Sequence, residues 1–306
     1  MNPNGQRFLH SVKLLVVGRF KAGKTNLSCS AAKAYATIDG TSQWLCRPVL
    51  IIDADGGTMS IPVELRTAPD VTYIGITTES DWTRAMTEAR SGKYKLVIFD
   101  SWTNLFDKFA MFARDLKPDA KGRNRDWNND ASDKVAEALE EWSDLAVRPE
   151  TRGITLISTA AVTDWWAGEF PNRTVIGERI QVPTRIESRL VGRNTAIWHC
   201  TREDPAPFRD ERGNLDIART NAAKRNGKLA SRGEPIPEGA EVLMSRYLVF
   251  TDPFAEYPYV KSQDGFASDV DAIAWNLNLA EVLARHHVLE QAAIANNQPH
   301  PIAETA

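Results

Sequence analysis

Short apolar runs alternate with amphipathic segments along the first half of the chain. The runs lie at residues 12–17, 48–53, 71–76, 95–100 and 153–159. Each run is apolar at consecutive positions, which is typical of strands that are covered on both faces of a sheet. Because such strands belong to parallel sheets wound with helices, the pattern predicts an α/β fold: a mainly parallel sheet flanked by helices on both faces.

Amphipathic helices are predicted between and after these strands. A segment rich in Ala and Ser follows the first strand, and apolar residues recur at helical spacing in several later segments. The predicted helices cover residues 24–37, 82–89, 105–116, 132–146 and 268–289.

The second half of the chain has weaker periodicity. Pro, Gly and Arg recur up to about residue 193, which predicts long loops. Strand-like runs return at 196–201 and 247–251 and predict a C-terminal β-hairpin extension, interrupted by a polar insertion and followed by the terminal helix. We expect one domain at 12–288. Within it we expect a core at 12–165, a basic loop region at 166–240, and C-terminal strands and a helix at 241–288. An N-terminal tail at 1–11 and a flexible tail at 289–306 are expected on either side of it.

A glycine-containing segment connects the first predicted strand to the first predicted helix. It reads Gly18-Arg19-Phe20-Lys21-Ala22-Gly23-Lys24-Thr25, with Asn26 next, and matches the Walker A phosphate loop, GxxxxGK[ST]. Gly18 and Gly23 permit the backbone to turn its N–H groups toward a phosphate. Lys24 would reach the β- and γ-phosphates, and the Thr25 hydroxyl would bind Mg²⁺. The segment therefore predicts a P-loop NTPase that binds a nucleoside triphosphate, ATP before others, with Mg²⁺.

Polar residues end three of the predicted strands. Asp100 follows an apolar strand, as in the Walker B motif, and is the candidate acid beside Mg²⁺. Asp53 and Asp55 close the second strand; Asp55 is the candidate base for the attacking water, and Asp53 supports the turn or the metal. Ser158 and Thr159 end the fifth strand, where Thr159 is a candidate contact for the γ-phosphate or the water.

With these segments in order, the chain resembles the RecA-like P-loop ATPases, and most closely the bacteriophage-encoded RecA-type and AAA family ATPases associated with recombination. The similarity covers roughly residues 12–165. It implies a hydrolase that converts ATP to ADP and phosphate, in a homo-oligomer with nucleotide at the subunit interfaces. Asp55 stands where that family has Glu, which implies slow turnover. Lys261 lies where relatives carry a basic residue that reaches a neighbouring subunit's nucleotide.

The same resemblance implies that DNA is a partner, with single-stranded DNA favoured over double-stranded DNA. Phage recombination or replication proteins are further implied partners. In that family, loops after the metal-binding and sensor strands hold DNA; here they correspond to residues 117–129 and 163–190. Cations can follow phosphates, and indoles can stack on bases. A third basic stretch begins at residue 219. The candidate DNA contacts are Arg123, Arg125, Trp165, Trp166, Arg173, Arg225 and Lys228.

Composition narrows these expectations without deciding between functions. The formal net charge is -3, so any contact with DNA must come from a local patch. The chain has 3 cysteines, which favours a location in a reducing cytoplasm, that of the host if the protein is encoded by a phage. It has no apolar run of transmembrane length, so we expect no membrane partner. Two alternatives stay open: a nucleotide-gated partner-binding switch or helicase loader, and a small-molecule phosphotransferase.

Overall fold

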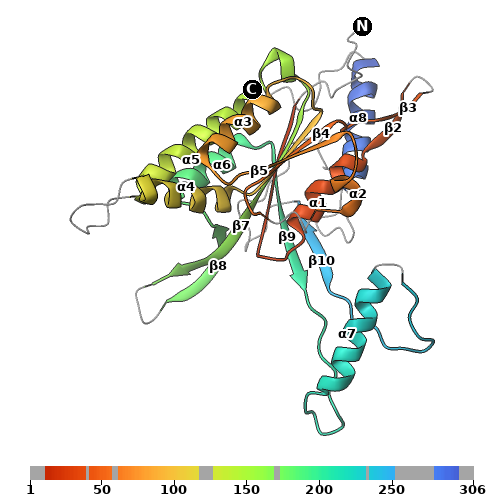
Figure 1. Ribbon diagram of the computed structural model, residues 1–306. Coiled ribbons are helices and arrows are strands. Elements are labelled where there is room, and N and C mark those ends of the chain that lie inside the picture. The colour runs from red at the N-terminus through yellow and green to blue at the C-terminus, as the bar shows by residue number, and fades with distance from the viewer. Residues whose placement is uncertain are drawn as a thin grey trace.

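A computed structural model describes residues 11–38, 41–56, 61–116, 127–168, 173–231, 234–251 and 279–295. Within this part of the chain an 8-stranded sheet has the order β10-β9-β1-β7-β6-β4-β5, with β8 paired to β7 (Figure 1). The strands are β1 (Val12–Gly18), β4 (Val49–Asp53), β5 (Val71–Gly75), β6 (Leu96–Asp100), β7 (Thr155–Ala167), β8 (Thr174–Ile180), β9 (Ala196–Glu203) and β10 (Arg246–Phe250). Only β8 and β10 pair antiparallel with their neighbours in this sheet.

Helices cover both faces of the sheet. In Figure 1, α3, α4, α5 and α6 lie on one face, and α1 and α8 lie on the other. The helices are α1 (Lys24–Ser30), α2 (Val63–Arg66), α3 (Glu79–Ala89), α4 (Trp102–Leu116), α5 (Trp127–Asp144), α6 (Thr184–Arg193), α7 (Ile217–Ser231) and α8 (Leu279–Ala295). The predicted fold class is confirmed, including the β9–β10 hairpin and the terminal helix.

The two-sided sheet explains why its strands are apolar at consecutive positions. Along β1, Leu15 and Val17 pack into one core, whereas Leu14 and Val16 pack into the other. Successive side chains of a strand point to opposite faces, so a strand with a core on each side favours apolar residues at consecutive positions.

This topology aligns the carboxyl ends of the central strands. β7 lies between β1 and β6, and β4 follows β6. Gly18 of β1 is in register with Ala161 of β7, and Asp53 of β4 with Asp100 of β6. The predicted phosphate loop and the predicted acids therefore share one end of the sheet. In open parallel sheets, this is the edge at which ligands bind.

The first predicted helix is shorter than the expected 24–37. It ends at Ser30 and is followed by a 3-10 turn at Ala31–Lys33 and by a small hairpin, β2 (Tyr35–Ile38) and β3 (Thr41–Trp44). Aromatic and β-branched residues favour extended structure when a partner strand is present, and β3 supplies that partner. The prediction of a helix through residue 37 was therefore wrong.

Residues 163–190 are more regular than the predicted loop. β7 continues to Ala167 and pairs with β8, and these two strands form a hairpin that projects from the sheet (Figure 1). α6 then begins after Pro183. The polar insertion between β9 and β10 likewise contains α7, which lies on an arm that extends away from the body (Figure 1).

Some predictions fall outside the described residues. These include Arg123, Arg125, Lys261 and the first part of the helix predicted at 268–289. The described part of that helix, α8, continues to Ala295, beyond the boundary at which a flexible tail was expected to begin.

Candidate nucleotide-binding site

The predicted phosphate loop has a backbone that only glycine suits at two positions. Gly18 has φ 154°, and a Cβ placed there would lie 2.2 Å from the carbonyl oxygen of Cys200. Gly23 has φ 89° and caps the N-terminus of α1. Lys21 between them also has a positive φ, of 65°. The glycines of the motif are therefore required by the neighbouring strand β9 and by the turn into the helix.

Lys24 is held inside this loop. Its ammonium group donates to the carbonyl oxygens of Gly18 at 2.9 Å and Arg19 at 3.0 Å. Burial lowers the pKa of Lys24, while the carboxylates of Asp100 and Asp55 act in the opposite direction. A partly desolvated cation between a phosphate loop and two acids is placed to bind an anion.

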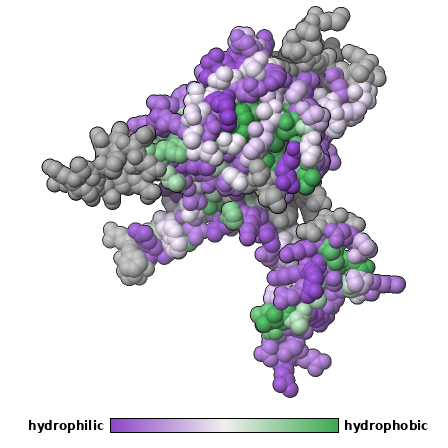
Figure 2. All heavy atoms as spheres, viewed as in Figure 1, coloured by the Kyte–Doolittle hydropathy of each residue, from purple (hydrophilic) through white to green (hydrophobic). Residues whose placement is uncertain are grey.

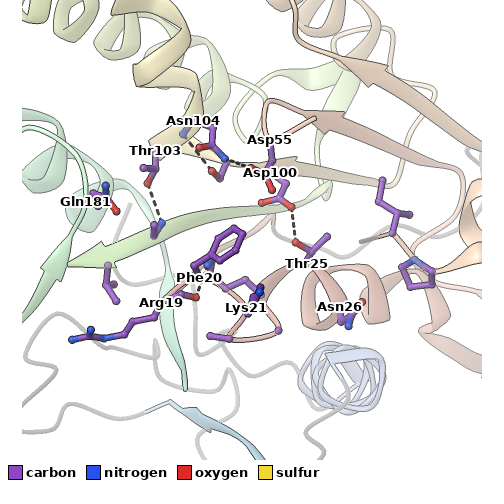
Figure 3. A pocket seen from close by; sticks show the side chains of 18 of the residues that line it. Arg19, Phe20, Lys21, Thr25, Asn26, Asp55, Asp100, Thr103, Asn104 and Gln181 are labelled. Atoms are coloured by element: carbon purple, nitrogen blue, oxygen red, sulfur yellow. Dashed lines mark hydrogen bonds between the residues drawn. The ribbon is translucent and has the colours of Figure 1, made fainter. Parts of the chain in front are cut away.

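Thr25 and Asp100 form the predicted metal-binding pair. The Thr25 hydroxyl donates to Asp100 Oδ2 at 2.6 Å (Figure 3). Burial raises the pKa of Asp100, and the hydroxyl donors Thr159 and Thr25 oppose that shift. Oxygen donors of this kind fit Mg²⁺, which prefers one or two protein ligands completed by phosphate and water oxygens. Among the described residues, no cluster of three or more His, Cys, Asp or Glu side chains could hold a metal ion.

Thr159 lies behind Asp100. Its side chain is fully buried, and its hydroxyl donates to Asp100 Oδ1. It is absent from the described lining of the cavity. Its position supports the Asp100 carboxylate, whereas the sequence suggested a direct contact with the γ-phosphate or with water.

The two acids at the end of β4 have different surroundings. Asp53 is buried and accepts three hydrogen bonds: from the backbone N–H groups of Asp55 at 2.8 Å and Gly56 at 2.9 Å, and from the Tyr73 hydroxyl at 2.5 Å. Asp55 is exposed, faces the cavity and accepts one side-chain hydrogen bond, from Asn104 Nδ2 at 2.5 Å (Figure 3). Asp53 therefore shapes the turn, and Asp55 has a carboxylate oxygen available for chemistry.

A cavity of about 1380 Å³ joins these groups. The phosphate loop from Arg19 to Asn26 forms one wall, and Asp55 and Asp100 lie at its centre (Figure 3). Beyond Asn26, Ile61, Pro62 and Val63 add apolar surface. The volume accommodates a nucleotide, since small-molecule sites occupy about 300–1000 Å³.

Several residues of this lining were missed in the sequence. They come from α4, from α2 and its approach, and from the end of β8: Thr103, Asn104, Asp107, Ile61, Pro62, Val63, Arg66 and Gln181. The position of Asn104, shortly after the strand-ending Asp100, is a signal that was available. Gln181 reaches the site only through the β7–β8 hairpin, which periodicity did not predict.

The loop residue Arg19 contacts the neck of the β7–β8 hairpin. Its guanidinium forms ion pairs with Asp164 of β7 and Glu178 of β8, which are register partners. Facing carboxylates on paired strands repel each other, so Arg19 offsets that repulsion. His199 lies 3.4 Å from Glu178, but burial lowers its pKa to about 3, so at neutral pH it adds no positive charge. The phosphate loop and the hairpin are thus electrostatically linked.

The candidate DNA contacts occupy two separate projections. Trp165 and Trp166 are 46% and 51% exposed on the hairpin, where Arg173 is exposed too. Arg225 and Lys228 are exposed on α7, which lies on the projecting arm (Figure 2). Both projections continue from the carboxyl ends of β7 and β9, the two strands that flank β1, and so leave the sheet at the edge that carries the phosphate loop.

Other cations of the second basic stretch are already paired. Their partners are carboxylates of α5 and α6: Arg179 with Glu187, Arg185 with Asp133, and Arg189 with Glu140. These arginines stabilise the packing of α6, so they contribute less to a DNA surface than the sequence suggested.

The fold and the site together define an α/β protein whose mainly parallel sheet carries a Walker A-like loop at the carboxyl end of a central strand. No protein-family model matches the sequence, and no curated protein is significantly similar to it. Among solved structures, the chain is similar to the RadB recombinase, with a TM-score of 0.34 and 16% identity over 64% of this chain and 76% of that chain. That similarity is too low to support inferences about function, so the geometry carries them.

No helix in the described ranges has both the length and the apolar character needed to cross a bilayer.

Proposed function

We propose that the protein is a RecA-like ATPase that binds ATP with Mg²⁺ and acts on DNA in phage recombination or replication. The observation that carries the proposal is the contact between Thr25 of the phosphate loop and Asp100 of the neighbouring acidic strand end. It joins the two halves of a nucleotide-binding site that lie far apart in sequence.

In this proposal the loop N–H groups and Lys24 bind the β- and γ-phosphates. Thr25 and Asp100 hold Mg²⁺, whose charge would neutralise part of the triphosphate when it is bound. Ile61, Pro62 and Val63 offer an apolar surface to the nucleobase.

Hydrolysis requires a base beside the γ-phosphate, and Asp55 is the best placed carboxylate. A water molecule attacks the γ-phosphorus, Asp55 accepts its proton, and the bond to the β–γ bridging oxygen breaks to release ADP and phosphate. Lys24 stabilises the charge on the transferred group. Asp53 is unsuited to this task because it already accepts three hydrogen bonds.

DNA is proposed to contact the two projections. Trp165 and Trp166 offer ring faces for stacking, with Arg173 beside the hairpin turn. Arg225 and Lys228 offer cations to the phosphate backbone. Assembly as a homo-oligomer with nucleotide at the interfaces, with Lys261 acting in a neighbouring site, belongs to the same proposal and follows from the family resemblance.

The proposal is tested by measuring ATP hydrolysis with and without single-stranded DNA, with Lys24→Ala as the blank. We expect Mg²⁺-dependent hydrolysis that DNA stimulates and that the variant lacks. Hydrolysis that is indifferent to DNA would refute the DNA-dependent ATPase, and activity retained by the variant would exclude the loop as its source.

A nucleotide-gated switch is the second candidate, and the contacts of Arg19 favour it. If phosphates attract Arg19 away from Asp164 and Glu178, nucleotide binding loosens the neck of the hairpin and alters its surface. Hydrogen exchange in residues 163–180 should then change with ATP analogues in wild type, and this response should disappear in Asp164→Asn/Glu178→Gln. Exchange that is unaffected by nucleotide would refute the switch.

A further inference from the structure

Asn104 is the side chain that fixes the candidate base. Its amide Nδ2 lies 2.5 Å from Asp55 Oδ1, and both residues line the cavity. The amide must present its NH₂ group to the carboxylate, because its oxygen would be repelled. No other side chain in the described part of the chain forms a hydrogen bond with the Asp55 carboxylate, so Oδ2 is left as the free acceptor.

Both partners of this hydrogen bond are held at the carboxyl edge of the sheet. The Asp55 backbone N–H donates to Asp100 O at 3.1 Å and to Asp53 Oδ1 at 2.8 Å, which ties it to β6 and β4. Asn104 lies in the first turn of α4, where the neighbouring Thr103 hydroxyl accepts from the Ala161 N–H at 3.0 Å. The pair is therefore preorganised by the sheet edge and not by a mobile loop.

A short acid needs such a partner more than a long one. The resemblance places Glu at this position in relatives, and Asp55 is one methylene shorter. Its carboxylate has a narrower range of positions from which to reach water, so its orientation matters for proton transfer.

We propose that Asn104 is a positioning residue that orients Asp55 so that Oδ2 accepts the proton of the attacking water. This role rests on the proposed ATPase activity. Asn104 Nδ2–H donates to Oδ1 throughout, the proton of water passes to Oδ2, and the γ-phosphoryl group is transferred to the water oxygen with ADP as leaving group.

The test compares Asn104→Ala, Asn104→Asp and Asp55→Ala, with Asn226→Ala as the matched control. Asn226 also donates a side-chain amide from a helix, to Glu241 O at 2.9 Å, but it lies on the arm. Steady-state hydrolysis is measured without DNA, and binding of a fluorescent ATP analogue reports that each variant is folded.

We expect Asn104→Ala to lower kcat by about 10- to 100-fold, the cost of a misplaced catalytic group, with little change in nucleotide affinity. Asn104→Asp should lower kcat as well, because it replaces the amide donor by a carboxylate that repels Asp55. Asp55→Ala/Asn104→Ala should be no slower than Asp55→Ala, since Asn104 acts only through Asp55. Asn226→Ala should match wild type.

Three results would overturn this role and are distinguishable. If Asp55→Ala is impaired and Asn104→Ala keeps wild-type kcat, the base assignment stands and the role of Asn104 fails. If Asp55→Ala itself keeps wild-type kcat, the proposed base and its positioning residue fail together. An additive loss in the double variant likewise excludes action through Asp55.

Discussion

The nucleotide pocket and the projecting arm differ in how far their charged groups are already paired. In the pocket, Lys24 donates hydrogen bonds to two carbonyl groups, and Asp100 accepts hydrogen bonds from two hydroxyl groups. On the arm, Arg219 of α7 is paired with Glu241, but α7 itself contains no acidic residue, and within the described chain neither Lys224 nor Arg225 forms a salt bridge. Paired groups in fixed positions select one ligand geometry, whereas exposed cations attract any polyanion.

The hairpin combines both situations. Its neck is ion-paired to the phosphate loop through Arg19, while its outer part exposes Trp165, Trp166, Val175 and Ile176. A two-stranded ribbon with exposed apolar side chains is only marginally stable alone. Under the proposed function, the pocket selects the nucleotide and the projections bind the polyanion, and each variant below alters one of them.

Lys24→Ala has the largest expected effect. Loss of the ammonium group should reduce kcat/KM for ATP by about 100- to 1000-fold, because the charge that stabilises the transferred phosphoryl group is removed. DNA affinity without nucleotide should remain at the wild-type level. A parallel loss of DNA affinity in fluorescence anisotropy would contradict the separation between pocket and projections.

Trp165→Ala and Trp166→Ala should weaken single-stranded DNA binding next most strongly. A base stacked on an aromatic ring contributes roughly 1–3 kcal/mol, which is about 5- to 150-fold in Kd. Basal ATP hydrolysis should change little, since neither indole lines the cavity. Trp82→Phe, in the core, tests for general effects of losing an indole; equal DNA affinity in all variants argues against stacking.

Charge removal on the arm should change the salt dependence of binding. In the triple variant Lys224→Ala, Arg225→Ala and Lys228→Ala, the slope of log Kd against log salt should fall by about 0.7 for each cation that contacts single-stranded DNA. Arg189→Ala with Arg193→Ala is the matched control, because both arginines are paired with Glu140. The same slope in the arm variant and in wild type would remove the arm from the DNA surface.

Asp100→Asn should have a smaller effect than the variants above. It should stabilise the fold at neutral pH, although it weakens the function of the site. Folding raises the pKa of Asp100 through burial, so stability is lost as pH rises from the unfolded carboxyl's pKa through the higher folded value. Removing the carboxyl should therefore raise Tm at neutral pH by about 2–4 °C, the shift that about 1 kcal/mol of added free energy of unfolding produces. At acid pH, Tm should not rise. Mg²⁺-dependent nucleotide binding should weaken. Thermal unfolding at two pH values checks the sign; a lower Tm at neutral pH would show that the carboxylate is stabilising.

Sequence reasoning worked best where the physical constraint is local or periodic. Consecutive apolar residues predicted the two-sided strands, and glycine spacing predicted the turn that Gly18 and Gly23 form. It failed at Thr37 and over residues 163–190, where pairing with another strand outweighs local preference. Within the range 163–190 that was expected to hold DNA, Arg185 and Arg189 are ion-paired, and the sequence did not reveal this because their partners on α5 are distant in sequence.

By itself, the sequence determined the fold class, the phosphate loop and the identity of the strand-ending acids, because each depends on neighbours within a few residues or on a simple period. Only the tertiary structure decided which of these groups meet. The Asp100 carboxylate accepts hydrogen bonds from Thr25 and from the buried Thr159. Asp53 accepts several hydrogen bonds, among them one from Tyr73, whereas the only side chain in the described part of the chain that donates to the Asp55 carboxylate is Asn104. Such contacts depend on strand order and register, which bring residues together across sequence separations that no local pattern records.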